Sequence, residues 1–226
     1  MIVGVALATL LPMAPPGVPV RCAAPRAVLE LGIDLSWLPG QQRAGASQAA
    51  QLRDLLLSGS GGAAESAQVD RLIDALAALR APFSGDLGSG LWRAAYTRGE
   101  KPRWERNAKI LPGVKNKAGQ SYDVAAGTVV NYGELLGASV HFVAEGGFTR
   151  ASSGNRCPQE FDVRIERGGV VLWGRPFVSD AISGPGFLRV LYAGDDVRIF
   201  ESPTESPDKW EAAGLIVVQV RDELFE

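Results

Sequence analysis

The chain has 226 residues and a formal net charge of −2, with 46% hydrophobic and 21% charged residues. This composition is typical of a globular protein and argues against intrinsic disorder, and the near-neutral charge gives no broad attraction for nucleic acid or anionic lipid. Because no apolar run reaches the roughly 20 residues that a membrane-spanning helix requires, we expect at most a peripheral contact with membranes.

Residues 1–26 are expected to be a leader. They contain no acidic residue, and their basic residues, Arg21 and Arg26, follow an apolar start. A secretory signal carries its positive charge before the apolar core, whereas an acid-poor leader with late arginines fits import into an organelle. The segment 20–24 (Val-Arg-Cys-Ala-Ala) is similar to the processing site of algal chloroplast transit peptides. Secretion and an unprocessed or misassigned start are the alternatives.

Residues 27–64 are expected to comprise an extended arm, a helix and a Gly/Ser linker. Apolar and polar residues alternate over 29–37, which gives one apolar face if this segment is extended, and Pro39-Gly40 ends the pattern. Ser47 is expected to cap a helix that contains Leu52, Leu55 and Leu56 before the Gly/Ser linker breaks it.

The folded domain is predicted to span residues 65–226 and to begin with a second helix. Its apolar residues fall on one helical face: Val69, Leu72, Ile73, Leu76 and Leu79. Ala81-Pro82 stops this helix, because the residue before proline avoids the helical region. We interpret the stripe as core packing rather than a membrane or partner face, and such a helix can close one end of a barrel.

From residue 84 onward the apolar period changes from 3.6 to 2, which predicts short antiparallel strands separated by turns. Gly168-Gly169 is expected to turn the chain between the strands 161–166 and 170–173, and residues 193–196 (Ala-Gly-Asp-Asp) form a second hairpin turn. The pattern predicts about eight to ten strands, and closure into a barrel commonly protects the edges of such a sheet. About eight strands leave room inside for one small ligand.

Four segments carry a resemblance to a known family. They are 91–97 (Leu-Trp-Arg-Ala-Ala-Tyr-Thr), 127–131 (Gly-Thr-Val-Val-Asn), 191–199 (Leu-Tyr-Ala-Gly-Asp-Asp-Val-Arg-Ile) and 214–220 (Gly-Leu-Ile-Val-Val-Gln-Val). In this order they resemble the first strand, a Gly-x-Val-x-Asn strand, a late hairpin and the closing strand of the plastid lipid-associated proteins, or fibrillins. The chain departs from the family in a basic segment, 100–116, and in an insert, 202–213.

The resemblance implies a mainly β fold, an antiparallel lipocalin-like β-barrel preceded by one or two α-helices. It implies a chloroplast location at plastoglobules or thylakoid membranes and a non-enzymatic function without a cofactor. That function is the binding or carriage of a hydrophobic molecule: a prenylquinone, a carotenoid or an acyl lipid. The main alternative is a filled barrel that serves as a scaffold on plastid lipid droplets or photosynthetic complexes, and an enzyme acting on a hydrophobic substrate is the weakest hypothesis.

Seven side chains are expected to face the barrel interior and to form the ligand site: Trp92, Tyr96, Val130, Phe142, Phe161, Tyr192 and Arg198. In lipocalin-like barrels a basic side chain from a late strand covers the first-strand Trp, so Arg198 is expected to stack on Trp92 at the closed end. Specificity is then expected at the other end, near residues 101–117. Part of this basic segment is expected to face a membrane, with a solvated loop as the alternative: Lys101, Arg103, Trp104, Arg106 and Lys109.

The remaining reactive residues give no catalytic or metal-binding pattern. His141, the single histidine, is expected on the surface, and Cys157 is expected to be a free thiol in a loop. Asp195-Asp196 are expected to form a turn rather than to bind a metal. The sequence contains no Gly-x-Ser-x-Gly, His-Glu-x-x-His or phosphate-binding Gly-Lys-Ser/Thr motif.

Overall fold

The computed structural model describes residues 39–59, 62–85, 87–88, 90–100, 117–178, 183–205 and 212–221. The chain divides into two units, Met1–Leu35 and Ser36–Glu226, and all of the described residues belong to the second. The expected leader and extended arm lie outside the described residues. So do the five residues expected to face a membrane, between positions 101 and 109.

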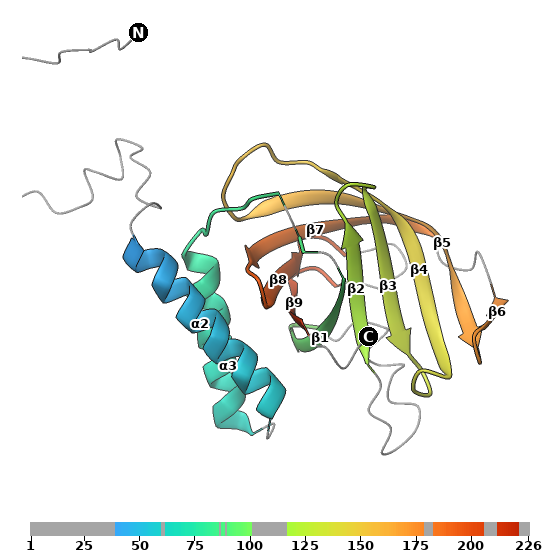
Figure 1. Ribbon diagram of the computed structural model, residues 1–226, viewed down its shortest axis with the longest axis horizontal. Coiled ribbons are helices and arrows are strands. Elements are labelled where there is room, and N and C mark those ends of the chain that lie inside the picture. The colour runs from blue at the N-terminus through green and yellow to red at the C-terminus, as the bar shows by residue number, and fades with distance from the viewer. Residues whose placement is uncertain are drawn as a thin grey trace, which may run out of the picture. The chain divides into compact units, whose positions relative to one another are not determined.

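Two helices precede the strands in the described part of the chain: α2 (Pro39–Ser58) and α3 (Ala63–Ala78) (Figure 1). The expectation that Ser47 caps the first helix is wrong, because α2 begins at Pro39. Proline is favoured at the first helical position, where its absent N–H would have no partner within the helix. The stripe predicted for α3 is confirmed, since four of its members are buried: Val69, Leu72, Ile73 and Leu76.

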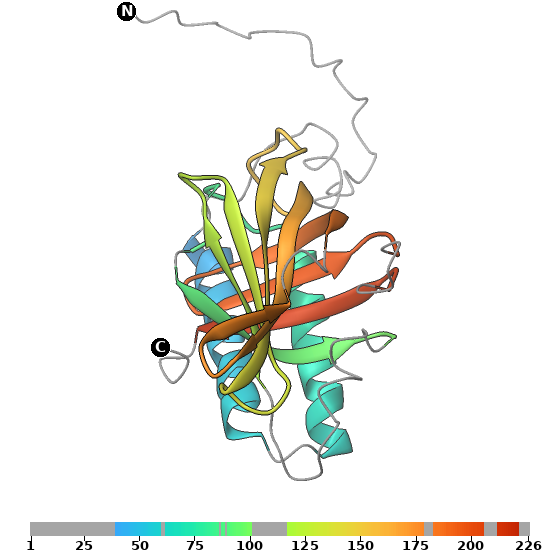
Figure 2. The ribbon, with the colours of Figure 1, turned by 90° about the vertical axis from the view of Figure 1, so that its right-hand side faces the viewer.

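The strands form one antiparallel sheet that closes roughly into a ring, as the sequence predicts (Figures 1 and 2). They are β1 (Leu91–Arg98), β2 (Ala118–Asp123), β3 (Thr128–Glu134), β4 (Val140–Arg150), β5 (Gln159–Leu172), β6 (Arg175–Val178), β7 (Gly184–Ala193), β8 (Val197–Ser202) and β9 (Leu215–Arg221). The order is β4-β3-β2-β1-β9-β8-β7-β5-β6, and an additional β4–β5 pairing closes the ring. β6 is appended to β5 outside the ring. The barrel is therefore consistent with a lipocalin-like fold.

One expected turn is absent from the described sheet. Gly168 and Gly169 do not turn the chain, because β5 continues through both and pairs with Ala144 and Val143 of β4. The turn instead lies at Trp173-Gly174, between β5 and β6, where both residues have positive φ. The hairpin expected at residues 193–196 is confirmed between β7 and β8.

The helices cover the outside of the barrel wall rather than one of its ends, which corrects the expectation for α3. Leu52 of α2 and the buried stripe of α3 share a core with outward-facing residues of β8 and β9 such as Ile199 and Val218. Tyr96 of β1 donates a hydrogen bond to Asp70 of α3 at 3.1 Å. Neither end of the ring is therefore closed by a helix of the described residues.

A second core fills one end of the ring, where β1 begins and β9 ends. Its buried residues are Phe83, Leu87, Tyr122, Val129, Cys157, Phe161, Leu188, Val190, Phe200. Phe83 and Leu87 come from the connection between α3 and β1, and the Phe83 and Phe161 rings meet edge to face with centroids 6.0 Å apart. We refer to this filled end as the closed end.

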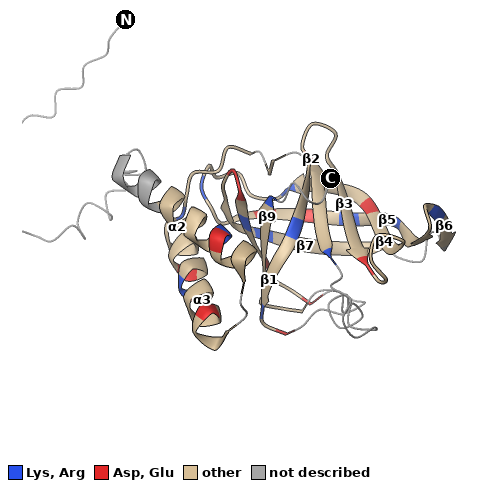
Figure 3. Cartoon of the chain, turned by 60° about the horizontal axis from the view of Figure 1, so that its bottom comes forward, with Lys and Arg blue, Asp and Glu red and all other residues tan. Residues whose placement is uncertain are grey.

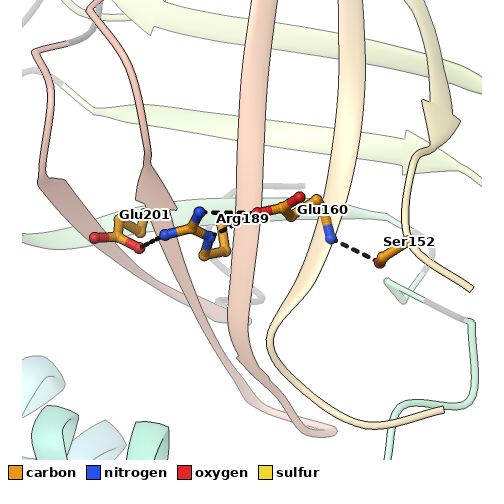
Figure 4. A network of polar contacts seen from close by, with 4 residues as sticks. All are labelled: Ser152, Glu160, Arg189 and Glu201. Carbon is orange, nitrogen blue, oxygen red and sulfur yellow. Dashed lines mark hydrogen bonds and ion pairs between the residues drawn. The ribbon is translucent and has the colours of Figure 1, made fainter. Parts of the chain in front are cut away.

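Charged residues of both signs are scattered over the described helices and strands (Figure 3). On the outer wall, Arg189 of β7 pairs with Glu160 of β5 at 2.8 Å and with Glu201 of β8 at 3.0 Å (Figure 4). The backbone N–H of Glu160 donates to the Ser152 hydroxyl at 3.0 Å. These pairs are partly exposed, so each stabilises the wall by at most about 1 kcal/mol.

Candidate functional site

The stacking predicted at the closed end is confirmed. The Cζ atom of Arg198 lies 3.9 Å from the centroid of the Trp92 ring. Both side chains are buried, with 0% and 1% of their surface exposed. A second guanidinium group, that of the exposed Arg221, lies 4.7 Å from the same centroid. Because Arg198 also donates a hydrogen bond to the carbonyl oxygen of Leu87, it ties the barrel wall to the segment that covers this end.

A chain of side-chain hydrogen bonds leads from Arg198 into the barrel. Its Nη2 donates to Gln219 Oε1 at 2.8 Å, and Gln219 Nε2 donates to Gln120 Oε1 at 2.7 Å. Gln120 Nε2 then donates to Asn131 Oδ1 at 2.7 Å. The four residues come from β8, β9, β2 and β3, so the chain runs along the inner wall of the barrel. Its first and last links join paired neighbouring strands, and the link from Gln219 to Gln120 passes over β1.

A pocket lies on the other side of this chain, toward the end of the ring where β1 ends and β2 begins. We call this end the open end. The pocket has a volume of about 110 Å³. Its apolar lining residues include Ala94, Ala118, Phe142, Leu188, Phe200, Leu215 and Val217. Three members of the hydrogen-bonded chain also line it, Gln120, Asn131 and Gln219, together with Ser202. The result is an apolar-walled pocket with a polar floor.

Two turns at the open end expose large apolar side chains. Leu136, in the β3–β4 connection, is 43% exposed, whereas Trp173 and Phe177, on the β5–β6 hairpin, are 77% and 71% exposed. The backbone N–H of Trp173 donates to the carbonyl oxygen of Ser139 at 2.7 Å, which holds the two turns together. We call Leu136, Trp173 and Phe177 the hydrophobic rim.

Of the seven side chains expected inside the barrel, the structure places four at or near the interior site. Phe142 lines the pocket, and Phe161 belongs to the closed-end core. Trp92 and Arg198 form the stacked pair at the closed end, which we call the plug. Val130 faces outward, since it alternates along β3 with the buried Val129.

The other two expected site residues, Tyr96 and Tyr192, lie on the helix side of the wall, where both pack in the core shared with α2 and α3. A β-bulge precedes each of them, between Ala94 and Tyr96 and between Val190 and Tyr192. A bulge inserts an extra residue and so shifts the inward–outward alternation. This shift is why strict alternation from Trp92 misplaces Tyr96.

The polar floor was not expected from the sequence. Gln219 offers the clearest signal, because it interrupts an otherwise apolar strand, Leu-Ile-Val-Val-Gln-Val. A buried polar group needs hydrogen-bond partners, so its position predicts a polar contact inside the barrel. Gln120 carries no such signal, because much of β2 is polar. Asn131 ends the Gly-Thr-Val-Val-Asn segment, which predicts a strand but not that the Asn131 side chain lines a pocket.

The remaining reactive groups form no part of the hydrogen-bonded chain, and one of them, Tyr132, also lines the pocket. His141 is on the outer face of β4, as expected, with Nδ1 2.8 Å from the carbonyl oxygen of Ala138. Cys157 is a free thiol, as expected, but it is buried, and burial raises its pKa to about 11. Burial, followed by the nearby Glu134 carboxylate, raises the pKa of Tyr132 to about 12. Asp195 and Asp196 lie in the β7–β8 turn, as predicted.

Within the described ranges, no group of three or more His, Cys, Asp or Glu side chains is arranged to hold a metal ion. Over the same ranges, neither helix has the length and apolar character needed to cross a membrane. Comparisons with family models, with curated proteins and with solved structures give no match.

Proposed function

We propose that the protein binds a small hydrophobic molecule in the pocket at the open end, without catalysing a reaction on it. The observation that supports this most directly is the apolar-walled pocket of about 110 Å³ above a plugged base. Ligand pockets are usually concave and mostly apolar, with a few polar groups that fix the ligand's orientation. This pocket has the same arrangement, with apolar side chains in its wall and a few polar groups in its floor.

The volume limits how much of a ligand the pocket holds. An apolar cavity of about 150 Å³ accommodates benzene, so this smaller pocket, of about 110 Å³, holds at most one ring or the end of a chain. The rest of a long molecule would then extend out of the pocket at the open end and contact the hydrophobic rim. The exposed Trp173 and Phe177 side chains suit a peripheral contact with a membrane, because aromatic residues favour the membrane–water interface.

The resemblance to the plastid lipid-associated proteins extends this proposal to a prenylquinone, carotenoid or acyl lipid at plastoglobules or thylakoid membranes. The alternative of a filled barrel acting as a scaffold has its own support in the aromatic core at the closed end, where Tyr122 and Phe148 also meet edge to face at 5.2 Å. That core occupies the closed half, whereas the pocket occupies the open half.

The test is a titration of the full chain with 11-(dansylamino)undecanoic acid, followed by fluorescence, together with mass spectrometry of lipids that co-purify with the protein. The variant Ala118→Phe adds a phenyl group at a pocket-lining position. Its matched control, Ala126→Phe, makes the same change in the exposed β2–β3 turn at the closed end. We expect saturable binding that Ala118→Phe weakens at least tenfold and Ala126→Phe leaves unchanged. A wild-type protein that binds neither the probe nor any co-purifying lipid would refute the proposal.

A further inference from the structure

The hydrogen bonds in the polar floor run in one donor-to-acceptor order, from Arg198 to Asn131. This order determines which ligand groups the pocket accepts. We infer that the pocket holds its ligand through a carbonyl-type hydrogen-bond acceptor on the ligand, bound by the side-chain N–H groups of Asn131. The inference rests on the proposed function, because it concerns the same pocket, and it goes further by naming the head group that the pocket accepts.

The direction begins at Arg198. A guanidinium group only donates hydrogen bonds, so the Gln219 atom that it contacts at 2.8 Å must be the carbonyl oxygen. This contact removes the usual ambiguity between the oxygen and nitrogen of an amide side chain. The Gln219 nitrogen is then the atom that faces Gln120, at 2.7 Å, and it can only donate.

The direction continues along the inner wall through Gln120. Gln120 must accept with its oxygen, and the Tyr122 hydroxyl also donates to this oxygen, at 3.5 Å. The nitrogen of Gln120 therefore donates to the oxygen of Asn131, at 2.7 Å. Asn131, at the end of the chain, is left with its amide nitrogen, whose two N–H groups are donors.

Asn131 lines the pocket and is only partly exposed. In the described part of the chain its side chain makes no hydrogen bond other than the one it accepts from Gln120. When a ligand fills the pocket and excludes water, a donor left without a partner costs about 1–3 kcal/mol, so a ligand oxygen that accepts from Asn131 is favoured over an apolar group. A ligand hydroxyl group at the same place can accept from Asn131 only when its own hydrogen turns away, so it is disfavoured relative to a carbonyl oxygen, which accepts without that constraint.

The two pocket-lining residues that carry a hydroxyl group do not change this preference. The hydroxyl group of Tyr132 donates to Glu134 Oε1 at 3.3 Å. Ser202 lines the pocket, but a hydroxyl group can rotate either to donate or to accept. Ser202 therefore contributes affinity for a polar head group without choosing between acceptors and donors. Discrimination lies with Asn131, because its orientation is fixed through Gln120 and Gln219 by Arg198.

Quinones and acyl lipids are two kinds of hydrophobic molecule that carry such an acceptor, the first on the ring and the second at the carbonyl group of the acyl chain. The pocket of about 110 Å³ receives the carbonyl end of either molecule, and the rest of the molecule extends toward the hydrophobic rim. A pure hydrocarbon offers no acceptor and would leave the Asn131 donors without a partner.

The experiment compares four probes with similar tails on the full chain: decylbenzoquinone, its reduced hydroquinone under anaerobic conditions, decylbenzene and methyl undecanoate. Dissociation constants come from isothermal titration calorimetry. Quinone and hydroquinone share their shape and tail and differ in whether the ring oxygens carry hydrogen. We expect the quinone to bind about 2- to 12-fold more tightly than the hydroquinone, as one hydrogen bond allows. Tighter binding of the quinone than of the ester would identify the ring as the head group, and the reverse would identify the acyl carbonyl.

Three variants test whether Asn131 causes the preference for the quinone over the hydroquinone. Asn131→Leu is expected to abolish it, whereas Asn131→Asp, which has nearly the same shape but presents an acceptor, is expected to reverse it toward the hydroquinone. Ser202→Ala is the matched control in the pocket wall, and it is expected to weaken quinone and hydroquinone equally.

The outcomes separate this inference from the proposed function. Equal binding of quinone and hydroquinone by the wild-type chain, or tighter binding of the hydroquinone, overturns the inference, and the proposed function stands because the probes bind. A preference that persists unchanged in Asn131→Asp also overturns it. Failure of all four probes to bind overturns both.

Discussion

Trp92 contacts two guanidinium groups that differ in burial, and this difference allows the stacking energy to be measured within one molecule. Arg198 is fully buried with its Cζ 3.9 Å from the ring centroid, whereas Arg221 is exposed and lies at 4.7 Å. A cation–π contact stabilises by about 2 kcal/mol when it is desolvated and by about 0.5–1 kcal/mol when it is exposed. We therefore expect a coupling free energy of about 2 kcal/mol for Trp92 with Arg198 and no more than about 1 kcal/mol for Trp92 with Arg221.

Two double-mutant cycles measure these couplings. They combine Trp92→Leu with Arg198→Met or with Arg221→Met, and the free energy of unfolding is obtained from urea titrations followed by far-UV circular dichroism. Arg198→Met also removes the hydrogen bonds to Leu87 and Gln219, each worth about 1.5–3 kcal/mol because the donor is charged. Those losses occur with and without Trp92, so they cancel in the cycle and leave the ring contact.

The reasoning fails if the coupling with Arg198 is below about 0.5 kcal/mol, or if it does not exceed the coupling with Arg221. Either result would mean that burial does not strengthen this contact, and the closed end would then be held by its apolar core and by the hydrogen bond from Arg198 to Leu87.

Three further predictions concern the wall, the buried thiol and the rim. Gly146→Ala should destabilise the fold by about 1–3 kcal/mol in urea titrations, because its β-carbon would overlap a backbone carbonyl of β5, whereas Gly147→Ala, with 3.5 Å of clearance, should have little effect. The pKa of Cys157 is raised from 9.0 to about 11, so the folded state retains a proton that the unfolded state releases. The free energy of unfolding should therefore fall as the pH rises from 9 to 11, more steeply in the wild type than in Cys157→Ala. Trp173→Ser should reduce flotation with phosphatidylcholine vesicles roughly tenfold, and Phe187→Ser, at an exposed site on the outer wall, should not.

The features that the sequence predicts well are those fixed by local pattern. The stripe of α3, the turn at residues 193–196 and the strand-rich composition after residue 84 all depend on the spacing of neighbouring residues. The contact between Trp92 and Arg198 was also predicted, although the two residues are far apart in the sequence. That prediction came from the family resemblance, because spacing alone gives no distance between strands β1 and β8.

The features that the sequence misses depend on what lies across the sheet. Gly168-Gly169 has the composition of a turn, but pairing with β4 keeps both residues in an extended strand. The bulges that turn Tyr96 and Tyr192 toward the helices arise where paired strands fall out of register. The helix pair could be expected to bury an apolar face, but that face does not reveal that its partner is the outer wall of β8 and β9.

The closed end and the pocket form one polar unit, although Arg198 does not contribute to the pocket lining. Its guanidinium group stacks on Trp92 and donates to Gln219, so the plug both closes the barrel and fixes which amide atoms face the pocket. A change at Arg198 should therefore alter the head-group preference as well as stability, because Gln219 and Gln120 would be free to reverse their amides. Arg198, which helps to close the barrel, then also determines whether Asn131, at the far end of the hydrogen-bonded chain, presents donors or an acceptor to a ligand.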